Sequence, residues 1–122
     1  MPLEYHEPRE QLPPMVVEQH RAIASVIEEL EAVAWYHQRA ALCQDAELKA
    51  VMEHNRDEEI EHAVMGLEWI RRNFAGFDDQ MRTYLFQSGS ITSLESGEGG
   101  EEGPDTDPSD ASAGSLNIGP MK

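Results

Sequence analysis

The chain has a single cysteine, few basic residues and no long run of apolar residues. One cysteine, Cys43, cannot form an intrachain disulfide, which fits a reducing compartment and offers no set of thiolates for structural zinc. The 9 basic residues stand against 24 acidic ones, and the formal net charge is −15. This balance argues against nucleic acid as a partner, because such binding needs clustered lysine and arginine. An acidic surface instead concentrates cations near it.

Signals for export and for membrane insertion are also missing. No N-terminal stretch combines the basic flank and the apolar run of a signal peptide. No apolar run approaches the roughly 18 residues that a membrane span requires. The sequence therefore predicts a soluble, cytoplasmic protein.

Composition divides the 122 residues into four parts. Residues 1–14 form an irregular arm that contains prolines, and residues 15–94 carry the helical patterns. Residues 95–113 lack aromatic and large aliphatic side chains, which predicts a disordered acidic linker. In residues 114–122 apolar side chains return at alternating positions between glycines. Because roughly 80 residues can fold, the core is small and oligomerisation is expected.

The apolar periodicity predicts an all-α fold. Two long helices are expected, from about 15 to 40 and from about 46 to 73. Asp45 suits the N-cap of the second helix, and the short junction makes the pair an antiparallel hairpin. A third, shorter helix is predicted from 78 to about 86, after a break at residues 74–77, and the segment that follows it is ambiguous.

The stretch that carries most chemistry is Glu59-x-x-His62 in the second helix. The spacing places both side chains on one face, one turn apart. A chain this rich in glutamate and histidine is expected to contain roughly 0.7 such pairs by chance, so the spacing alone proves nothing. The context adds weight, because Glu29 of the first helix lies among aliphatic residues and ionised carboxylates are rarely buried without a partner or a metal.

Two interpretations of these residues remain open from the helical pattern. In one, Arg56 and Arg71 form salt bridges with the carboxylates and His62 is a packed core histidine. In the other, Glu29, Glu59 and His62 are metal ligands, a donor set that suits iron, manganese or zinc. One chain then carries half of a carboxylate-bridged di-iron site. A second chain across a two-fold axis would complete a ferritin-like four-helix bundle with four glutamates and two histidines.

Neighbouring residues have candidate supporting roles. Tyr36, two turns beyond Glu29, can hydrogen-bond a ligand or accept an electron, or it can be a core tyrosine. Glu28 and Glu31 can form an outer acidic site that draws Fe²⁺ inward, or they can belong to a solvated helix face. Gly66 lowers helix propensity in mid-helix, which suggests that another backbone or a ligand approaches closely there.

Three segments within about residues 15–95 resemble encapsulated ferritins, the iron-oxidising cargo proteins of bacterial encapsulin shells. They contain Glu28-Glu29-Leu30-Glu31-Ala32-Val33 with Trp35-Tyr36 and Gln38-Arg39, then His54-Asn55-Arg56-Asp57-Glu58-Glu59 with Glu61-His62-Ala63, Glu68-Trp69 and Arg71-Arg72-Asn73, then Arg82-Thr83-Tyr84-Leu85-Phe86. The resemblance implies a hairpin with a short third helix, a di-iron ferroxidase centre formed only at a dimer interface, and dimers assembled into a ring-shaped decamer. The matched positions are Glu29, Glu59 and His62 for the ferroxidase ligands, Tyr36 for a second-shell tyrosine, and Glu28 and Glu31 for glutamates that guide metal inward. His37 matches no family residue.

The last nine residues resemble encapsulin-targeting peptides. Leu116, Ile118 and Met121 would fill pockets on the inner wall of the shell, as an extended peptide fills a groove. The acidic linker would tether the oligomer while leaving it free to move. The resemblance thus implies a location inside an encapsulin nanocompartment in the cytoplasm.

The expected function is a ferroxidase that oxidises Fe²⁺ with O₂ and delivers iron for storage in that compartment. One alternative is an acidic helical interaction module without catalysis. Another is a different di-metal oxygenase or peroxidase built on the same half-bundle.

Overall fold

The computed structural model describes residues 3–97, and the part of the chain it describes contains helices and no strand. This confirms the all-α prediction. Most of the predicted linker and all of the predicted targeting peptide lie outside the described residues. None of the helices in the described part combines the length and the apolar character needed to cross a membrane. The chain divides into two compact units, Met1–Ala75 and Gly76–Lys122, and each is described by itself.

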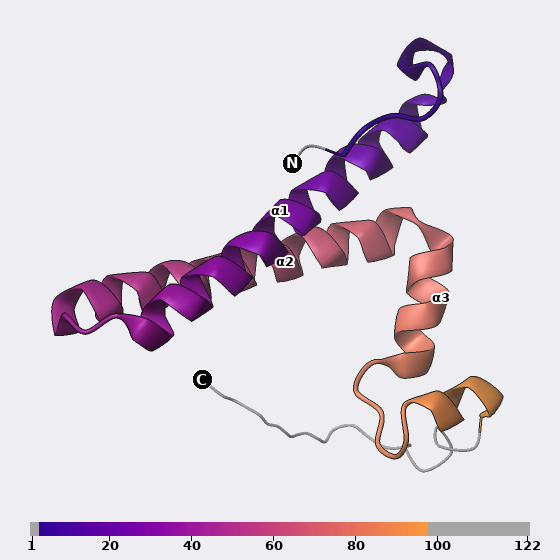
Figure 1. The fold of residues 1–122 in the computed structure, drawn as a ribbon. Helices are drawn as coiled ribbons and strands as arrows, with labels where there is room; N and C mark the ends of the chain where they lie inside the picture. The colour runs from indigo at the N-terminus through magenta and orange to yellow at the C-terminus, as the bar shows by residue number, and fades with distance from the viewer. Residues whose placement is uncertain (1–2, 98–122) are drawn as a thin grey trace. The chain divides into compact units, whose positions relative to one another are not determined.

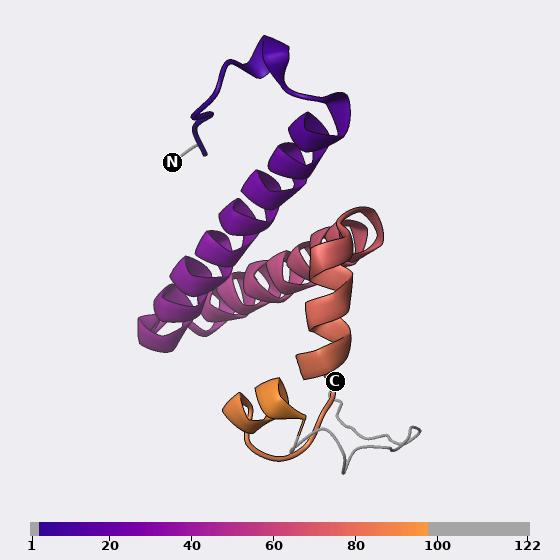
Figure 2. The same cartoon turned by 90° about the vertical axis from the view of Figure 1, so that its right-hand side faces the viewer.

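The first unit is an antiparallel hairpin of α1 (Pro14–Leu42) and α2 (Ala46–Asn73), as Figures 1 and 2 show. The bounds of α2 are as predicted, and α1 is one residue longer at its start and two at its end. Proline in the first turn is tolerated because its missing N–H would have no helical partner there. Asp45 caps α2, since its Oδ2 accepts a hydrogen bond of 2.8 Å from the Leu48 N–H. The predicted N-cap at Asp45 and the predicted short junction between antiparallel helices are therefore both confirmed.

Polar side chains connect the two helices near both ends of the hairpin. Close to the junction, Lys49 Nζ donates to the carbonyl oxygen of Ala40 at 2.8 Å. At the open end, Gln19 Nε2 donates to the carbonyl oxygen of Asn73 at 2.6 Å. Asn73 is the last residue of α2, so its carbonyl has no donor within the helix, and the Ala40 carbonyl also accepts from the Cys43 N–H at 3.4 Å. Together the two side-chain hydrogen bonds fix the register of α1 against α2.

The core of the hairpin is small. Its buried apolar residues are Val26, Ala40, Ala63 and Ile70. Large apolar side chains on both helices remain about half exposed, among them Leu30, Trp35, Val64 and Met65. The hairpin thus carries apolar surface that its two helices do not cover.

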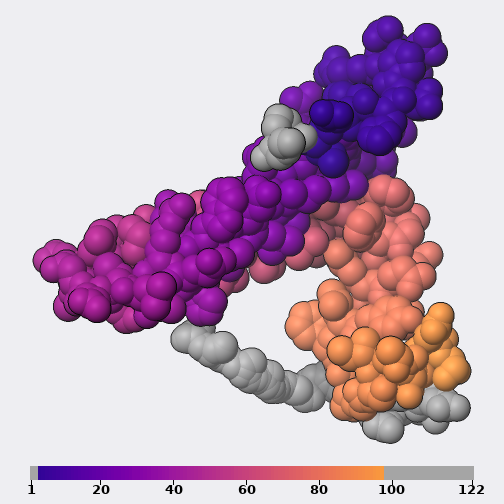
Figure 3. All heavy atoms as spheres, in the orientation of Figure 1, coloured from indigo at the N-terminus to yellow at the C-terminus, as the bar shows by residue number. Residues whose placement is uncertain are grey.

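The N-terminal arm, which includes the short 3₁₀ helix η1 (Arg9–Gln11), folds back onto the first half of α1 (Figure 3). His20 Nε2 lies 2.9 Å from the carbonyl oxygen of Leu3. The ring of Tyr5 stacks on that of His20 with the centroids 4.0 Å apart. The arm is therefore irregular, as predicted, but attached.

The second unit contains all of the third helix except its first residue, Ala75. This helix, α3 (Ala75–Tyr84), begins three residues before the predicted start and ends two residues before the predicted end. The predicted four-residue break was wrong because the extended backbone of Phe74, with φ −151° and ψ 96°, alone ends α2. Phe86 adopts φ 60° just beyond α3, a left-handed conformation that commonly follows a helix end. The ambiguous segment contains η2 (Thr92–Ser96), which buries Leu94.

The cap of α2 yields a first prediction. We expect Asp45→Ala to destabilise the chain by about 1 kcal/mol, the usual effect of removing a capping oxygen. Asp45→Asn keeps an acceptor oxygen at the same place and should recover most of that loss. Urea unfolding at fixed chain concentration measures both. Equal losses for the two variants would contradict a capping role.

Candidate metal centre

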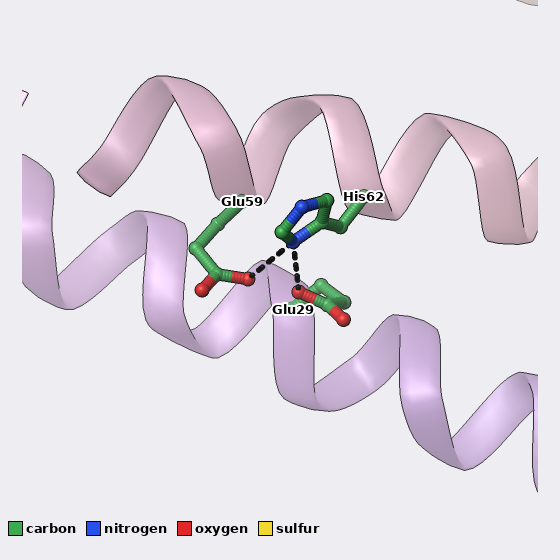
Figure 4. A group of neighbouring side chains, drawn as sticks. All are labelled: Glu29, Glu59 and His62. Carbon is green, nitrogen blue, oxygen red and sulfur yellow. Dashed lines mark ion pairs between the residues drawn. The ribbon is translucent and has the colours of Figure 1, made fainter. Parts of the chain in front are cut away.

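Glu29, Glu59 and His62 lie together where α1 crosses α2 (Figure 4). Glu29 projects from α1, and Glu59 and His62 project from α2 one turn apart. His62 Nδ1 lies 3.7 Å from Glu29 Oε1 and 3.5 Å from Glu59 Oε1. The three donor atoms all lie within 4.8 Å of one another, and among residues 3–97 this is the group of histidine, cysteine and acidic side chains able to hold a metal ion. The structure therefore brings together the three residues that the sequence predicts as metal ligands.

The spacing of the donor atoms fits a metal ion. Nitrogen and carboxylate ligands bind transition metals at about 2.1 Å, so two ligands of one ion lie at most about 4.2 Å apart. The separations of 3.5 and 3.7 Å from His62 Nδ1 are below that limit. Two carboxylates and an imidazole also form a donor set that iron, manganese and zinc accept. Only small side-chain movements would allow all three residues to bind one ion.

The electrostatics of the cluster favour a cation. The pKa of Glu29 is raised above its ordinary value, first by a hydrogen bond shared with Glu59, then by partial burial, and then by the charge of Glu59. His62 opposes this rise and Glu28 adds to it. Two carboxylates that compete for a proton carry negative charge that the protein has not neutralised. A divalent cation would displace the proton and neutralise both groups.

The two arginines of the salt-bridge interpretation have partners outside the cluster. Arg56 Nε pairs with Asp57 Oδ1 at 3.0 Å, and its Nη1 lies 3.2 Å from His37 Nδ1. Arg71 donates two hydrogen bonds to Glu68, and together with Arg72 it lowers the pKa of that carboxyl to about 2. Both arginines proposed as charge partners of the cluster thus bind other groups.

His62 is not packed into the core of the single hairpin. Its side chain is 42% exposed, while those of Glu29 and Glu59 are 29% and 27% exposed. The cluster is therefore open on one side. Its carboxylates are partly desolvated, which strengthens their attraction for an ion, and solvent still reaches the imidazole.

A fourth side chain at the cluster was missed from the sequence. Glu58 Oε1 lies 3.8 Å from His62 Nε2, whereas Glu29 and Glu59 lie near Nδ1 of the same ring. The other oxygen of Glu58 lies 3.9 Å from His54 Nε2. Both pairs have i,i+4 spacing on α2, so the sequence did contain the signal. A carboxylate near the second nitrogen of a histidine helps to fix which nitrogen is free to bind a metal.

Tyr36, Glu28 and Glu31, the residues with predicted supporting roles, do not belong to the cluster itself. The Tyr36 ring lies under the guanidinium of Arg39, whose Cζ is 5.4 Å from the ring centroid. Glu28 is exposed and Glu31 half-buried, and within the described part neither joins the three-residue group. Glu28 still acts on the cluster through its charge on Glu29. The roles of these three residues remain predictions.

The raised pKa of Glu29 yields a second prediction. Because the folded chain holds this proton more tightly than the unfolded chain, the stability it contributes is present below pH 4.5 and is lost as pH rises through the raised pKa. Without metal, the free energy of unfolding of the wild type should therefore fall as pH rises from 4.5 to neutrality. In Glu29→Gln this fall should be smaller. Adding Zn²⁺ should restore stability at neutral pH in the wild type and not in the variant.

Urea unfolding at fixed chain concentration, with chelator and with Zn²⁺, measures both effects. Glu47→Gln removes the same charge from the exposed first turn of α2 and serves as the control. A wild-type chain whose stability at neutral pH ignores Zn²⁺ would contradict the metal site.

Comparison with known proteins places the chain in a family. An encapsulated ferritin-like protein of Rhodospirillum rubrum is 50% identical over 121 residues, which cover 96% of this chain and 86% of that protein. A ferritin-like protein of Thermotoga maritima is 51% identical over 92 residues, 75% of this chain and 81% of that protein. The crystal structure of a protein from Nitrosomonas europaea superposes with a TM-score of 0.69 at 53% identity, over 71% of this chain and 96% of that one. The model of the EncFtn-like family matches residues 4–88, and the chain therefore belongs to the EncFtn-like family.

Proposed function

We propose that the chain is a ferroxidase whose di-iron centre forms between two copies of the hairpin. The reaction is 4 Fe²⁺ + O₂ + 4 H⁺ → 4 Fe³⁺ + 2 H₂O. The observation that carries the proposal is the cluster of Glu29, Glu59 and His62, which fits a metal ion yet supplies half of a ferritin-like ligand set. Membership of the EncFtn-like family and the ferritin-like names of its relatives support iron as the metal.

Two copies are needed to complete both the ligand set and its charge balance. One chain supplies two carboxylates and one imidazole, so two chains supply four carboxylates and two neutral imidazoles. Their charge of −4 is balanced by two Fe²⁺ ions. A two-fold axis is the simplest symmetry that brings identical half-sites together. The exposed apolar residues of the hairpin, such as Leu30, Val64 and Met65, give the second copy a surface to cover. The result is a four-helix bundle.

The carboxylates and the imidazole of the cluster have different proposed roles. Glu29 and Glu59 supply negative charge and can bridge two ions, which keeps both within the reach of one oxygen molecule. His62 supplies a neutral nitrogen donor from Nδ1, and Glu58 beside Nε2 favours the tautomer in which Nδ1 is free to bind. Carboxylate oxygens suit Fe²⁺ and bind Fe³⁺ more tightly still.

Residues outside the cluster are proposed to serve the same reaction. Glu28 and Glu31 would attract Fe²⁺ toward the centre, which fits the effect of Glu28 on the pKa of Glu29. Tyr36 would hydrogen-bond a ligand or accept an electron.

The proposal also covers how the chain assembles and where it is held. We propose that dimers form a ring-shaped decamer held inside an encapsulin shell through Leu116 and Ile118, which lie outside the described residues. The word "encapsulated" in the name of the Rhodospirillum rubrum relative supports such a shell. The described hairpin has no interior in which a mineral could collect, so the shell would store the oxidised iron.

Two rivals make different predictions. An acidic interaction module that binds a basic partner would dimerise without regard to metal, and loss of His62 would not affect its assembly. Another di-metal oxygenase or peroxidase would consume a second substrate or peroxide. The ratio of O₂ consumed to Fe²⁺ oxidised, which is one to four for the proposed reaction, separates this rival from a ferroxidase.

The catalytic proposal is tested on the full chain with Fe²⁺ in air. We expect Fe³⁺ to form faster than in protein-free buffer, and Glu59→Ala to lower that rate by on the order of a hundredfold, since a bridging ligand is lost from each half-site. Glu47→Ala serves as the control and should leave the rate near wild type. The ferroxidase proposal fails if Fe³⁺ forms no faster with protein than without it, or if Glu59→Ala oxidises iron at the wild-type rate.

The shared site also predicts that metal promotes dimerisation. Without metal, four carboxylates at the interface repel one another, and a divalent cation removes this repulsion. Sedimentation of the wild type should therefore shift toward larger species when Zn²⁺ or anaerobic Fe²⁺ is added. His62→Ala should lose most of the shift. A metal-independent dimer would favour the interaction module.

A further inference from the structure

Gly66 of α2 lies against Val26 of α1 with no room for a side chain between them. A Cβ atom built on Gly66 would lie 2.6 Å from Val26 Cγ2. Carbon atoms in favourable contact are at least about 3.5 Å apart, so the space is too small by about 0.9 Å. Val26 is 6% exposed and cannot turn away into solvent. As a β-branched residue in a helix it also has one strongly preferred rotamer.

The backbone of Gly66 gives no other reason for glycine. Gly66 lies inside the regular part of α2, and its φ is not in the left-handed region that favours glycine. Glycine at such a position makes a helix less stable than alanine would. The approach of α1 therefore explains the residue, and the neighbour is a valine side chain rather than the backbone or ligand that the sequence suggested.

The contact lies one turn from the metal cluster on both helices. Val26 precedes Glu29 by three residues, and Gly66 follows His62 by four. At these spacings the side chains share a helix face. Ala63 and Ile70, which flank Gly66 at i−3 and i+4, are both buried and continue the same line of contact. Since a helix is stiff over a single turn, the distance between α1 and α2 at Gly66 sets their distance at the cluster.

We propose that Gly66 and Val26 are positioning residues that set the helix spacing at which Glu29 can share an ion with Glu59 and His62. The inference rests on the metal site of the proposed function and adds the structural element that fixes its geometry. Metal–ligand distances tolerate changes of about 0.2 Å, whereas a methyl group at position 66 requires the helices to separate by several times that. Neither residue touches the ion.

The test uses the full chain and Co²⁺, whose visible absorption reports both binding and ligand geometry. We expect Gly66→Ala to weaken Co²⁺ binding by on the order of tenfold or more, as loss of a supporting residue does at other metal sites. The same substitution raises helix propensity, so a role in helix stability alone predicts no weakening. Val26→Ala removes the methyl groups that a new Cβ would meet. The double variant should therefore recover most of the lost affinity and the wild-type spectrum.

The outcomes separate this inference from the proposed function. Wild-type Co²⁺ binding in Gly66→Ala would overturn the positioning role and leave the ferroxidase untouched. A double variant with wild-type helicity that binds no better than Gly66→Ala would also overturn it. If Gly66→Ala fails to fold, the double variant decides, and it should bind Co²⁺ about as well as Val26→Ala. A wild-type chain that binds no Co²⁺ would overturn both the site and its positioning.

Discussion

The repulsion between Glu29 and Glu59 is the interaction on which the rest of the structure depends. The two carboxylates come from different helices and compete for a proton, which raises the pKa of Glu29. The hydrogen bond that they share and the neighbouring His62 act locally. Helix packing holds the two carboxylates close as well, through the Gly66–Val26 contact one turn away and the hydrogen bonds at both ends of the hairpin. The packing energy of α1 against α2 is therefore used in part to hold like charges close, and in the proposed function a divalent cation would make this arrangement favourable.

The same hairpin is incomplete in two ways that have one solution. Its four buried apolar residues form a small core, and larger apolar side chains such as Leu30 and Met65 are left half exposed. Its cluster offers three donor atoms where a carboxylate-bridged pair of ions needs about twice that number. A second copy packed across a two-fold axis would supply apolar surface and ligands together. Folding, dimerisation and metal binding would then be thermodynamically linked, so a change in one would shift the others.

Features with a local cause were predictable from the sequence. The bounds of α2 follow from apolar periodicity and from the cap at Asp45, and the cluster follows from i,i+3 spacing on one helix and a carboxylate on the facing helix. The start of α3 was mispredicted because one extended residue, Phe74, separates the two helices where a break of four residues was expected. Glu68, the partner of Arg71, lies at i,i+3 spacing, so the sequence did contain that signal. The contact of Arg56 with His37 joins the two helices and did not follow from the spacing within one of them. The residue facing Gly66 depends on the register of α1, which the pattern of one helix does not specify.

Anomalous diffraction at the iron edge, on crystals of the full chain soaked with Fe²⁺, tests the central claim most directly. The account predicts two adjacent peaks between paired chains, each next to His62 Nδ1 of one chain and within reach of Glu29 and Glu59. The iron pair would lie on or across the two-fold axis. A single peak bound by one chain alone, or iron found only on the acidic surface, would contradict a centre shared between two copies.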